Sequence, residues 1–559
     1  MTTQQTIETI TSNNENVDII RKILGCGGRW QLRIIFLVYL VKIPSSWFMA
    51  CVIFTAPAPW YGEYLCKPSS LSNISVDKSQ ILDWNKIVHP EAEDYHKHFI
   101  DQCQIYDDAR ERWQNFTSGI RVDNESESTT KCEEFEFHED FVTAATTFNL
   151  VCDRKWLVPL TQSFHLFGIF LGVLISNELL KNHPPKFVMK LGMVLQVMFG
   201  CLTGQVPFVF HCLLRSADAA CCVLMFASGG MVFQDITDGK WKLTAMTLFE
   251  IFWSIGLIFL SGIGYVFKSW DLIYFAISIP TLFLIPLTEM FIPNSPLWLL
   301  KRGHYEEAKA ILLESARVNN RQSSIPKDFD ELLAKQMNRI KAEPPPAKWT
   351  EIWEDTRTSI NLACVHLSQT FSIILYYAIL LNIAVFGREN LYTTTIVAGL
   401  SELIGAFVGY AFVLHTKRLK WQLTGLLNIV GGLLFLIPWI YTFDEADWLE
   451  WCLYVMSTMV AKIAISCSLA VMAGCTGDLV TGNRKKTAVY SVLAFSRFWL
   501  VFGPMTLAAG VWFGRMVPLS LMGGMTAFNG VLSLLIRPKV PKITQISSIQ
   551  GVYKMNQIN

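Results

Sequence analysis

Long apolar runs separated by polar segments dominate the 559-residue chain. A membrane-spanning helix needs roughly 20 mainly apolar residues. By this measure we expect spans at residues 31–54, 156–180, 187–207, 208–233, 243–267, 271–292, 359–385, 392–414, 421–442, 448–473, 488–512 and 516–536. The third and fourth runs are nearly fused, with only Gln205 and Pro207 indicating a turn, so the count of twelve stays open by one.

Basic residues concentrate in every second connection between these spans. That set of connections contains Lys181, Lys186, Lys190, Lys240, Lys242, Lys301, Arg302, Lys417, Arg418, Lys420, Arg484, Lys485 and Lys486. The alternate connections hold few basic residues, and one of them is acidic at Asp444, Glu445 and Asp447. Because Lys and Arg favour the cytoplasmic side, we expect both termini, residues 1–30 and 537–559, in the cytoplasm. This parity also requires an even number of spans.

Residues 55–155 form a long polar segment after the first span, on the side that the charge pattern places outside the cell. Glycosylation sequons begin at Asn73, Asn115 and Asn124, and their clustering in this one segment supports that placement. The segment also contains Cys66, Cys103, Cys132 and Cys152. In an oxidising compartment four cysteines indicate two disulfides with three possible pairings, and free thiols are the alternative.

A second polar segment, residues 293–358, follows the sixth span and is expected to be a cytoplasmic linker. Residues 305–313 and 327–342 have the apolar spacing of amphipathic helices. A six-helix bundle over 31–292, this linker and a second six-helix bundle over 359–536 match the two-bundle plan of the major facilitator fold, an all-α membrane fold. Binding sites in such transporter folds lie near the membrane midplane between repeats.

Composition and motifs narrow the function class. Charged residues make up 17% of the chain, against about a quarter in soluble domains, and the net charge of +1 gives no field for attracting nucleic acid. We find no nucleotide-binding loop, metalloprotease, serine-hydrolase or dinucleotide motif and no paired-cysteine zinc motif. We therefore expect a non-enzyme without cofactor or metal. It should be a monomer in the lipid bilayer, driven by a coupling ion, the membrane potential or the substrate gradient.

Several motifs resemble the organic cation/anion/zwitterion transporters, solute carrier family 22. They occur in family order at residues 148–156 (FNLVCDRKW), 294–300 (NSPLWLL), 303–308 (GHYEEA), 375–378 (LYYA), 399–402 (GLSE), 461–465 (AKIAI) and 496–497 (SR). The resemblance covers residues 30–538 and implies the major facilitator fold and transport of small organic ions. Sugar porters share the SPxW element, so a sugar porter is a weaker alternative.

The chain departs from this family in the loops that form its cytoplasmic gate. Residues 181–186 (KNHPPK) stand where the family has DRxGRR between the second and third spans, and the corresponding loop after the eighth span, residues 414–418 (LHTKR), is altered to the same degree. The large loop has four cysteines instead of the usual six. Asp235 with Lys242, and Asp478 with Lys485, keep the charge signs that the resemblance implies for the gate. A half-altered gate indicates a shifted conformational balance or a relative that no longer transports.

Charged residues inside the spans are the candidate site residues, because each costs about 2.5–3.5 kcal/mol to insert and therefore faces a cavity or a partner. Lys42 lies beside Pro44 in the first span, where it could bind a substrate carboxylate, pair with an acid or extend to the interface. Arg215 and Asp218 are three residues apart on one helical face, and we expect a structural ion pair there.

The remaining candidates come from the resemblance. Glu250, Trp253, Gln369, Tyr376, Glu402, Lys462 and Arg497 align with family positions that line the cavity or carry charge. Arg497 matches the anion and carnitine-type members, since a guanidinium can bind a carboxylate at two points. The alternatives are Glu250 paired with Lys462 or Arg497, and Arg497 neutralised by Glu402.

Together these residues offer both acids and bases to a substrate. The mixed set favours transport of zwitterionic or anionic metabolites, such as amino-acid-like, carnitine-like or amine-conjugate compounds, by alternating access. The alternative from another class is a transport-incompetent relative that acts as a receptor or scaffold. The sequons indicate the secretory route and hence a multi-pass protein of the plasma membrane.

Overall fold

Helices occupy the apolar runs that the sequence pattern predicts. The computed structural model describes residues 19–25, 27–56, 64–67, 76, 80–94, 97–100, 103–120, 128–137, 141–353, 355–381, 391–416, 419–436, 448–504 and 516–538. Within these residues, nine helices are long and apolar enough to cross a membrane. The other three predicted spans contain the helices α18, α20 and α22, whose bounds follow.

The first bundle contains one helix for each of the first six predicted spans. Its helices are α3 (Arg29–Ala50), continued by the short α4 (Val52–Thr55), α8 (Leu157–Asn182), α9 (Pro185–Thr203), α10 (Phe208–Ile236), α11 (Gly239–Val266) and α12 (Trp270–Phe291). The nearly fused third and fourth runs are separate helices, because α9 ends at Thr203 and α10 begins directly after Pro207. Pro207 has no N–H to donate, and it precedes the first turn of α10, where that N–H is not needed.

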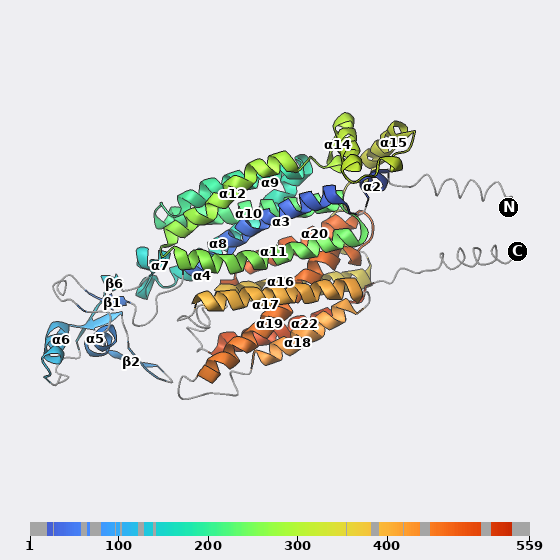
Figure 1. Ribbon diagram of the computed structural model, residues 1–559. Helices are drawn as coiled ribbons and strands as arrows, with labels where there is room; N and C mark the ends of the chain where they lie inside the picture. The colour runs from blue at the N-terminus through green and yellow to red at the C-terminus, as the bar shows by residue number, and fades with distance from the viewer. Residues whose placement is uncertain are drawn as a thin grey trace.

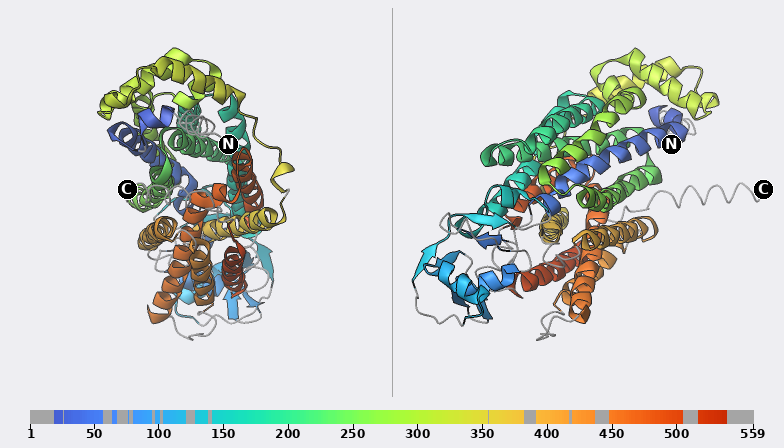
Figure 2. Two further views of the ribbon diagram at one scale, coloured as in Figure 1. Left: turned by 90° about the vertical axis from the view of Figure 1, so that its right-hand side faces the viewer. Right: turned by 60° about the vertical axis from the view of Figure 1, so that its left-hand side comes forward.

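The second bundle repeats this plan after the linker. Its helices are α16 (Thr356–Leu381), α17 (Leu391–His415), α18 (Lys420–Leu434), α19 (Trp448–Cys475), α20 (Arg484–Leu500) and α22 (Met516–Leu535). Figure 1 shows the two bundles as layers, with α11 of the first bundle beside α17 of the second, and these two helices are in direct contact. Helices α8 and α20 form another contact between the bundles, and Figure 2 shows the layers in two further views.

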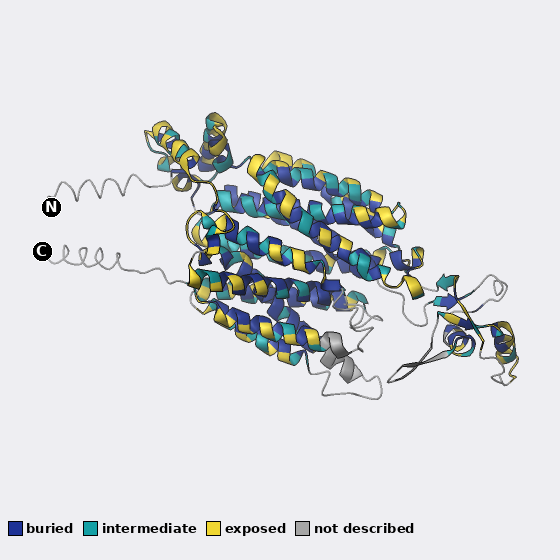
Figure 3. Cartoon of the chain, turned by 180° about the vertical axis from the view of Figure 1, so that it is seen from behind, coloured by how far each residue is buried: buried dark blue, intermediate teal, exposed yellow. Residues whose placement is uncertain are grey.

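Apolar side chains lie exposed along the outer faces of both bundles. Examples are Phe36, Val209, Phe283 and Leu433, each more than half exposed. Exposed positions recur along the outward helix faces in Figure 3, while the faces between helices are buried. Large exposed apolar surfaces mark contact with a membrane or a partner, and here they fit a protein whose helices are surrounded by lipid.

Small residues allow α8 and α10 to pack closely. A Cβ atom added at Gly168 would lie 2.0 Å from the backbone oxygen of Ser216. We therefore expect Gly168→Ala to destabilise the first bundle by about 1–3 kcal/mol, because α8 must move away from α10. Thermal unfolding of the purified protein measures the change. Gly230→Ala is the matched control, since a Cβ atom there meets no other atom within 4 Å, and equal melting temperatures for both variants would contradict the prediction.

A small strand domain, formed by the described residues between 64 and 137, lies at one end of the bundles (Figure 1). Its elements are β1 (Tyr64–Cys66), α5 (Ile81–Val88), β2 (Glu91–Asp94), β3 (Lys97–Ile100), β4 (Gln104–Tyr106), α6 (Ala109–Thr117), β5 (Thr129–Lys131) and β6 (Phe135–Phe137). The strands pair antiparallel as β1–β6, β2–β3 and β4–β5. Trp84 and Trp113 pack edge to face in its apolar core.

The prediction of two disulfides is confirmed, and the pairing is Cys66–Cys132 and Cys103–Cys152. The second bond joins the strand domain to the segment just before α8.

Asn115 lies on α6, half-buried, whereas Asn73 and Asn124 fall outside the described residues. Just before the short helix α7 (Ala144–Thr147), the Val142 N–H donates to the Lys268 oxygen and the Trp270 N–H donates to the Val142 oxygen, which ties this segment to the connection between α11 and α12.

The linker folds into three helices at the opposite end, namely α13 (Pro296–Arg302), α14 (Tyr305–Val318) and α15 (Phe329–Ala342). The Ser295 side chain caps α13 by accepting a hydrogen bond from the Trp298 N–H, and Gly303 ends that helix in the left-handed conformation. Helices α14 and α15 pack on α2 (Ile19–Leu24), whose isoleucines join the linker in one apolar core. The two predicted amphipathic helices thus form a cover over this end of the first bundle.

Candidate functional site

Lys42 and Glu250 form an ion pair inside the first bundle, between α3 and α11. Lys42 Nζ lies 3.3 Å from Glu250 Oε1, and the two side chains are 5% and 36% exposed. The ammonium also lies 4.1 Å from the ring centroids of both Phe226 and Phe249, and 5.5 Å from that of Trp253. Aromatic faces attract a desolvated cation. The salt-bridge partner of Glu250 is therefore Lys42 and not Lys462, while Arg497 is a further electrostatic neighbour of Glu250.

Glu402 and Lys462 form a second ion pair inside the second bundle, between α17 and α19. Lys462 Nζ lies 2.8 Å from Glu402 Oε1, with side chains 0% and 3% exposed. The approach is a charge contact, since the two atoms do not have the angles of a hydrogen bond. Because Glu402 is paired with Lys462, the alternative in which Glu402 neutralises Arg497 is wrong.

Two aromatic side chains connect these ion pairs across the boundary between the bundles. Trp253 Nε1 on α11 donates to the Tyr376 hydroxyl on α16 at 2.5 Å. Lys462 Nζ lies 5.8 Å from the Tyr376 ring centroid, and the Tyr376 hydroxyl interacts with Glu402. Lys42 and Lys462 are therefore linked by two cation–aromatic contacts, to Trp253 and to Tyr376, and by the hydrogen bond between these two rings across the bundle boundary.

Arg497 on α20 retains hydrogen-bonding capacity and, unlike Lys42 and Lys462, forms no salt bridge in the described part of the chain. It interacts electrostatically with Glu250 and Tyr377, yet its buried NH1 atom has no hydrogen-bond partner in the described part of the chain. A buried donor without a partner is costly, so a ligand acceptor at this position would gain a charge-assisted hydrogen bond. Gln369 is buried two turns before Tyr376 on α16, and no hydrogen bond joins it to another described side chain of the group.

The two ends of α11 also contact α17. Thr244 Oγ1 lies 3.2 Å from the Tyr410 hydroxyl at the linker end. Ser261 Oγ donates to the Tyr392 backbone oxygen at 2.8 Å towards the other end, where Lys268 Nζ also donates to the Tyr392 hydroxyl. The charged group lies between these contacts, and Lys42, Glu402 and Lys462 are buried.

The residues predicted to form the gate have other partners. Asp235 accepts a hydrogen bond from Ser295 at 2.5 Å, and its electrostatic neighbours are Lys486 of the second bundle and then Lys242. Asp478 lies 3.9 Å from Lys420. In the described part of the chain neither carboxylate forms an ion pair with Lys242 or Lys485. The four predicted gate residues are therefore distributed over both bundles and do not form the two expected ion pairs in the described part of the chain.

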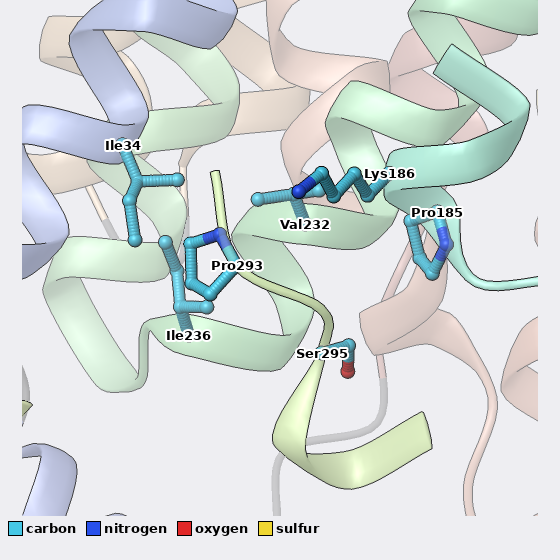
Figure 4. A pocket seen from close by; sticks show the side chains of 7 residues that line it. All are labelled: Ile34, Pro185, Lys186, Val232, Ile236, Pro293 and Ser295. Atoms are coloured by element: carbon cyan, nitrogen blue, oxygen red, sulfur yellow. The ribbon is translucent and has the colours of Figure 1, made fainter. Parts of the chain in front are cut away.

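A cavity of about 10 Å³ adjoins this gate, which is room for no more than a water molecule. Figure 4 shows the side chains around it, which include Ile34, Val232 and Ile236 together with Lys186 and Ser295. Lys186 and Lys190 both bind Glu289, at 3.1 and 2.9 Å. Lys186, at the end of the altered loop, and Lys190, one turn further along α9, thus hold α9 to α12.

Arg215 and Asp218, predicted to form a structural ion pair, interact electrostatically without a direct salt bridge. Both residues are buried and both are described, but no salt bridge joins them. Asp218 Oδ2 accepts a hydrogen bond from Thr203 at 3.2 Å, while Asp218 Oδ1 and two guanidinium nitrogens of Arg215 have no partner in the described part of the chain. Spacing on one helical face permits a pair, but the neighbouring helix α9 supplied a competing donor.

Known proteins share both sequence features and the fold of this chain. The model of the Major Facilitator Superfamily matches residues 155–504, more than half of the chain. The chain belongs to the Major Facilitator Superfamily. As a member of this superfamily it is a multi-pass membrane protein, and it stands among transporters rather than enzymes. Its fold resembles the partially occluded inward-open xylose transporter XylE from E. coli, with a TM-score of 0.55, 13% identity, and coverage of 90% of this chain and 97% of that one.

Curated relatives confirm the resemblance to solute carrier family 22. Solute carrier family 22 member 4 of Mus musculus is 25% identical over 540 residues, which cover 92% of this chain and 91% of the relative. Solute carrier family 22 member 13 of Homo sapiens is 26% identical over 70% of this chain and 68% of its own. Organic cation/carnitine transporter 2 of Rattus norvegicus is 24% identical over 96% of this chain and 94% of its own.

Sequence reasoning missed two members of the site. Phe226 on α10 and Phe249 on α11 surround the Lys42 ammonium. The chain contains 37 phenylalanines, and nothing in their spacing separates a ring beside a buried cation from one in ordinary packing. The adjacency of Phe249 to Glu250 was the one local signal that could have indicated such a role.

Proposed function

We propose that this superfamily member transports small organic ions that carry a carboxylate, namely zwitterionic or anionic metabolites, by alternating access between the two bundles. The observation that supports this most is the buried Arg497 NH1 atom, which has no hydrogen-bond partner among the described residues. A substrate carboxylate would supply the missing acceptor and a compensating negative charge. The guanidinium fork could bind it at two points.

The surroundings of Glu250 suit the other end of a zwitterion. Its side chain is 36% exposed although it is paired with Lys42. A substrate ammonium approaching Glu250 would also meet Trp253, which provides an aromatic face. Acid and base are thus present in one site, as amino-acid-like, carnitine-like or amine-conjugate compounds require. The charge of the site argues against a sugar, which needs neutral amides and hydroxyls.

The names of similar proteins are consistent with this substrate class. One relative is named as an organic cation/carnitine transporter, and carnitine is a zwitterion. Other relatives are named as organic cation transporter proteins, so simple cations are the competing substrates. We further propose that the strand domain faces the outside of the plasma membrane and is glycosylated, because the basic connections lie at the linker end.

Uptake into liposomes containing the purified protein tests this function. We expect compounds with both a carboxylate and an amine to enter faster than singly charged cations of similar size, with protein-free liposomes as the control. Faster uptake of simple cations would overturn the proposed substrate class. Saturable binding with no uptake of any compound would overturn transport.

Binding without uptake is the result expected of the second candidate function, a receptor or scaffold on the same fold. The specific observation in its favour is the gate, where Asp235 is held by Ser295 and Asp478 approaches Lys420. The first contact joins α10 to the linker and the second lies within the second bundle, so both carboxylates have partners other than the gate residues of the opposite bundle. The partly exposed ion pair in the site favours transport, because charges inside a membrane are expensive to keep without a function.

A further inference from the structure

A cavity of about 450 Å³ lies at the linker end of the molecule, where three segments distant in the sequence meet. Its walls come from the residues before α3, the start of α11 and the residues after α14. Figure 1 shows α14 and α2 at this end of the bundles. The proposed substrate site lies elsewhere, between the bundles, so this cavity needs a separate explanation.

Asn319 holds the walls of the cavity together. Its Oδ1 atom accepts a hydrogen bond from the Trp30 N–H at 3.0 Å, and its Nδ2 atom donates to Gln31 Oε1 at 2.9 Å. Gly28 permits this approach, since a Cβ atom there would lie 2.4 Å from Asn319 Oδ1. The linker is therefore fastened to the beginning of α3, and the cavity is formed before any ligand binds.

The cavity is lined by cations without carboxylate partners. Arg29 and Arg321 both line it and are exposed, and neither forms a hydrogen bond or an ion pair with another described side chain. Arg21 and Lys242 lie close by, where Arg21 pairs with Asp238 at 3.2 Å and Lys242 interacts with both. Four basic side chains against the two carboxylates of Asp238 and Asp235 leave an excess of positive charge.

The position of the cavity is that of lipid headgroups. Helices α3 and α11 are both long and apolar enough to cross a membrane, and both begin beside this cavity. Trp241, which lines the cavity in the first turn of α11, is 41% exposed, as expected for an aromatic residue at the membrane interface. Helix α3 also begins at this cavity, and the positive N-terminal end of its dipole favours an anion.

We propose that this cavity binds a phosphorylated anion at the cytoplasmic membrane surface, through the guanidinium groups of Arg29 and Arg321 and the Trp241 ring. Arginine forks match phosphate oxygens, and basic pockets on the cytoplasmic side of membrane helices bind phosphoinositide headgroups. The phosphate comes either from an inositol lipid or from a soluble inositol phosphate. Occupancy fastens α11, which carries Glu250 and Trp253, to the linker, and so regulates the bundle that contains half of the proposed site.

The test measures binding of the full-length protein in detergent to two probes. One is phosphatidylcholine vesicles with a small fraction of phosphatidylinositol bisphosphate, and the other is soluble inositol trisphosphate. We expect Arg29→Gln combined with Arg321→Gln to weaken binding about 30-fold, from roughly fivefold for each lost surface charge. Arg317→Gln is the matched control, since Arg317 is exposed near the end of α14, four residues before Arg321, but does not line the cavity.

The two arms separate the sources of the phosphate. Loss confined to the vesicle arm assigns the site to a lipid headgroup, and loss in both arms assigns it to a free phosphate as well. Equal binding by native protein and the double variant in both arms would overturn the site. So would equal binding to vesicles with phosphatidylserine at matched total charge, which shows surface attraction alone. These measurements do not depend on uptake, so they remain informative if transport fails.

Discussion

Uptake of a carboxylate-bearing substrate is expected to fall about 10- to 100-fold when Arg497 is replaced by alanine. The substitution removes the cation whose NH1 atom has no hydrogen-bond partner among the described residues, and hydrogen bonds to charged groups contribute about 1.5–3 kcal/mol. Initial uptake rates in liposomes, measured over a range of substrate concentrations, determine the loss. Uptake of a simple organic cation should fall much less, because such a substrate has no group for Arg497 to bind.

Arg497→Lys is the matched control for this result. It keeps the charge but loses the planar fork, so we expect an intermediate rate. Equal losses of carboxylate and cation uptake in Arg497→Ala would mean that the residue supports the fold rather than the substrate. Unchanged carboxylate uptake would remove Arg497 from the site altogether.

Replacing Lys462 by methionine is expected to destabilise the protein by about 3–5 kcal/mol. The side chain is fully buried and paired with Glu402, which would remain as an uncompensated buried charge. Thermal unfolding in detergent measures the change. Adding Glu402→Gln should recover most of the lost stability, since it removes the second charge while keeping the volume. Non-additive effects of this kind identify a direct interaction.

The exposed pair between Lys309 and Asp330 on the linker provides the contrast. These side chains are 27% and 67% exposed, and surface ion pairs contribute little to stability. We expect Lys309→Met to leave the melting temperature nearly unchanged. If Lys462→Met is as mild as Lys309→Met, or if Glu402→Gln fails to rescue it, the buried pair does not have the energetic role described above.

The sequence was sufficient for the helices because lipid imposes a length and an apolar composition on every span. Even the nearly fused third and fourth runs resolved at Pro207, as the residue type required. The linker helices followed from their apolar spacing in the same way. The disulfide pairing could not be predicted, since four cysteines allow three connectivities and the choice depends on how β1 and β6 meet.

The members of the site were found more readily than their partners. Insertion cost identified Lys42, and family resemblance identified Glu250, but 208 positions separate them in the chain. Which acid pairs with which base depends on how the helices are rotated and packed. The number of charged residues in each span carries no information about this. The same holds for Arg215 and Asp218, which interact electrostatically while the Asp218 carboxylate accepts its hydrogen bond from Thr203 of another helix.

The disulfide between Cys103 and Cys152 and the hydrogen bonds at Val142 attach the strand domain to the first bundle. When the bundles rock against each other, this domain should travel with the first one as a lever arm. A fluorophore on α6 and another at the outer end of α17 would then report the conformational cycle as a change in energy transfer. By the same reasoning, an antibody fragment that clamps the lever arm to the second bundle would arrest the cycle without entering the substrate site.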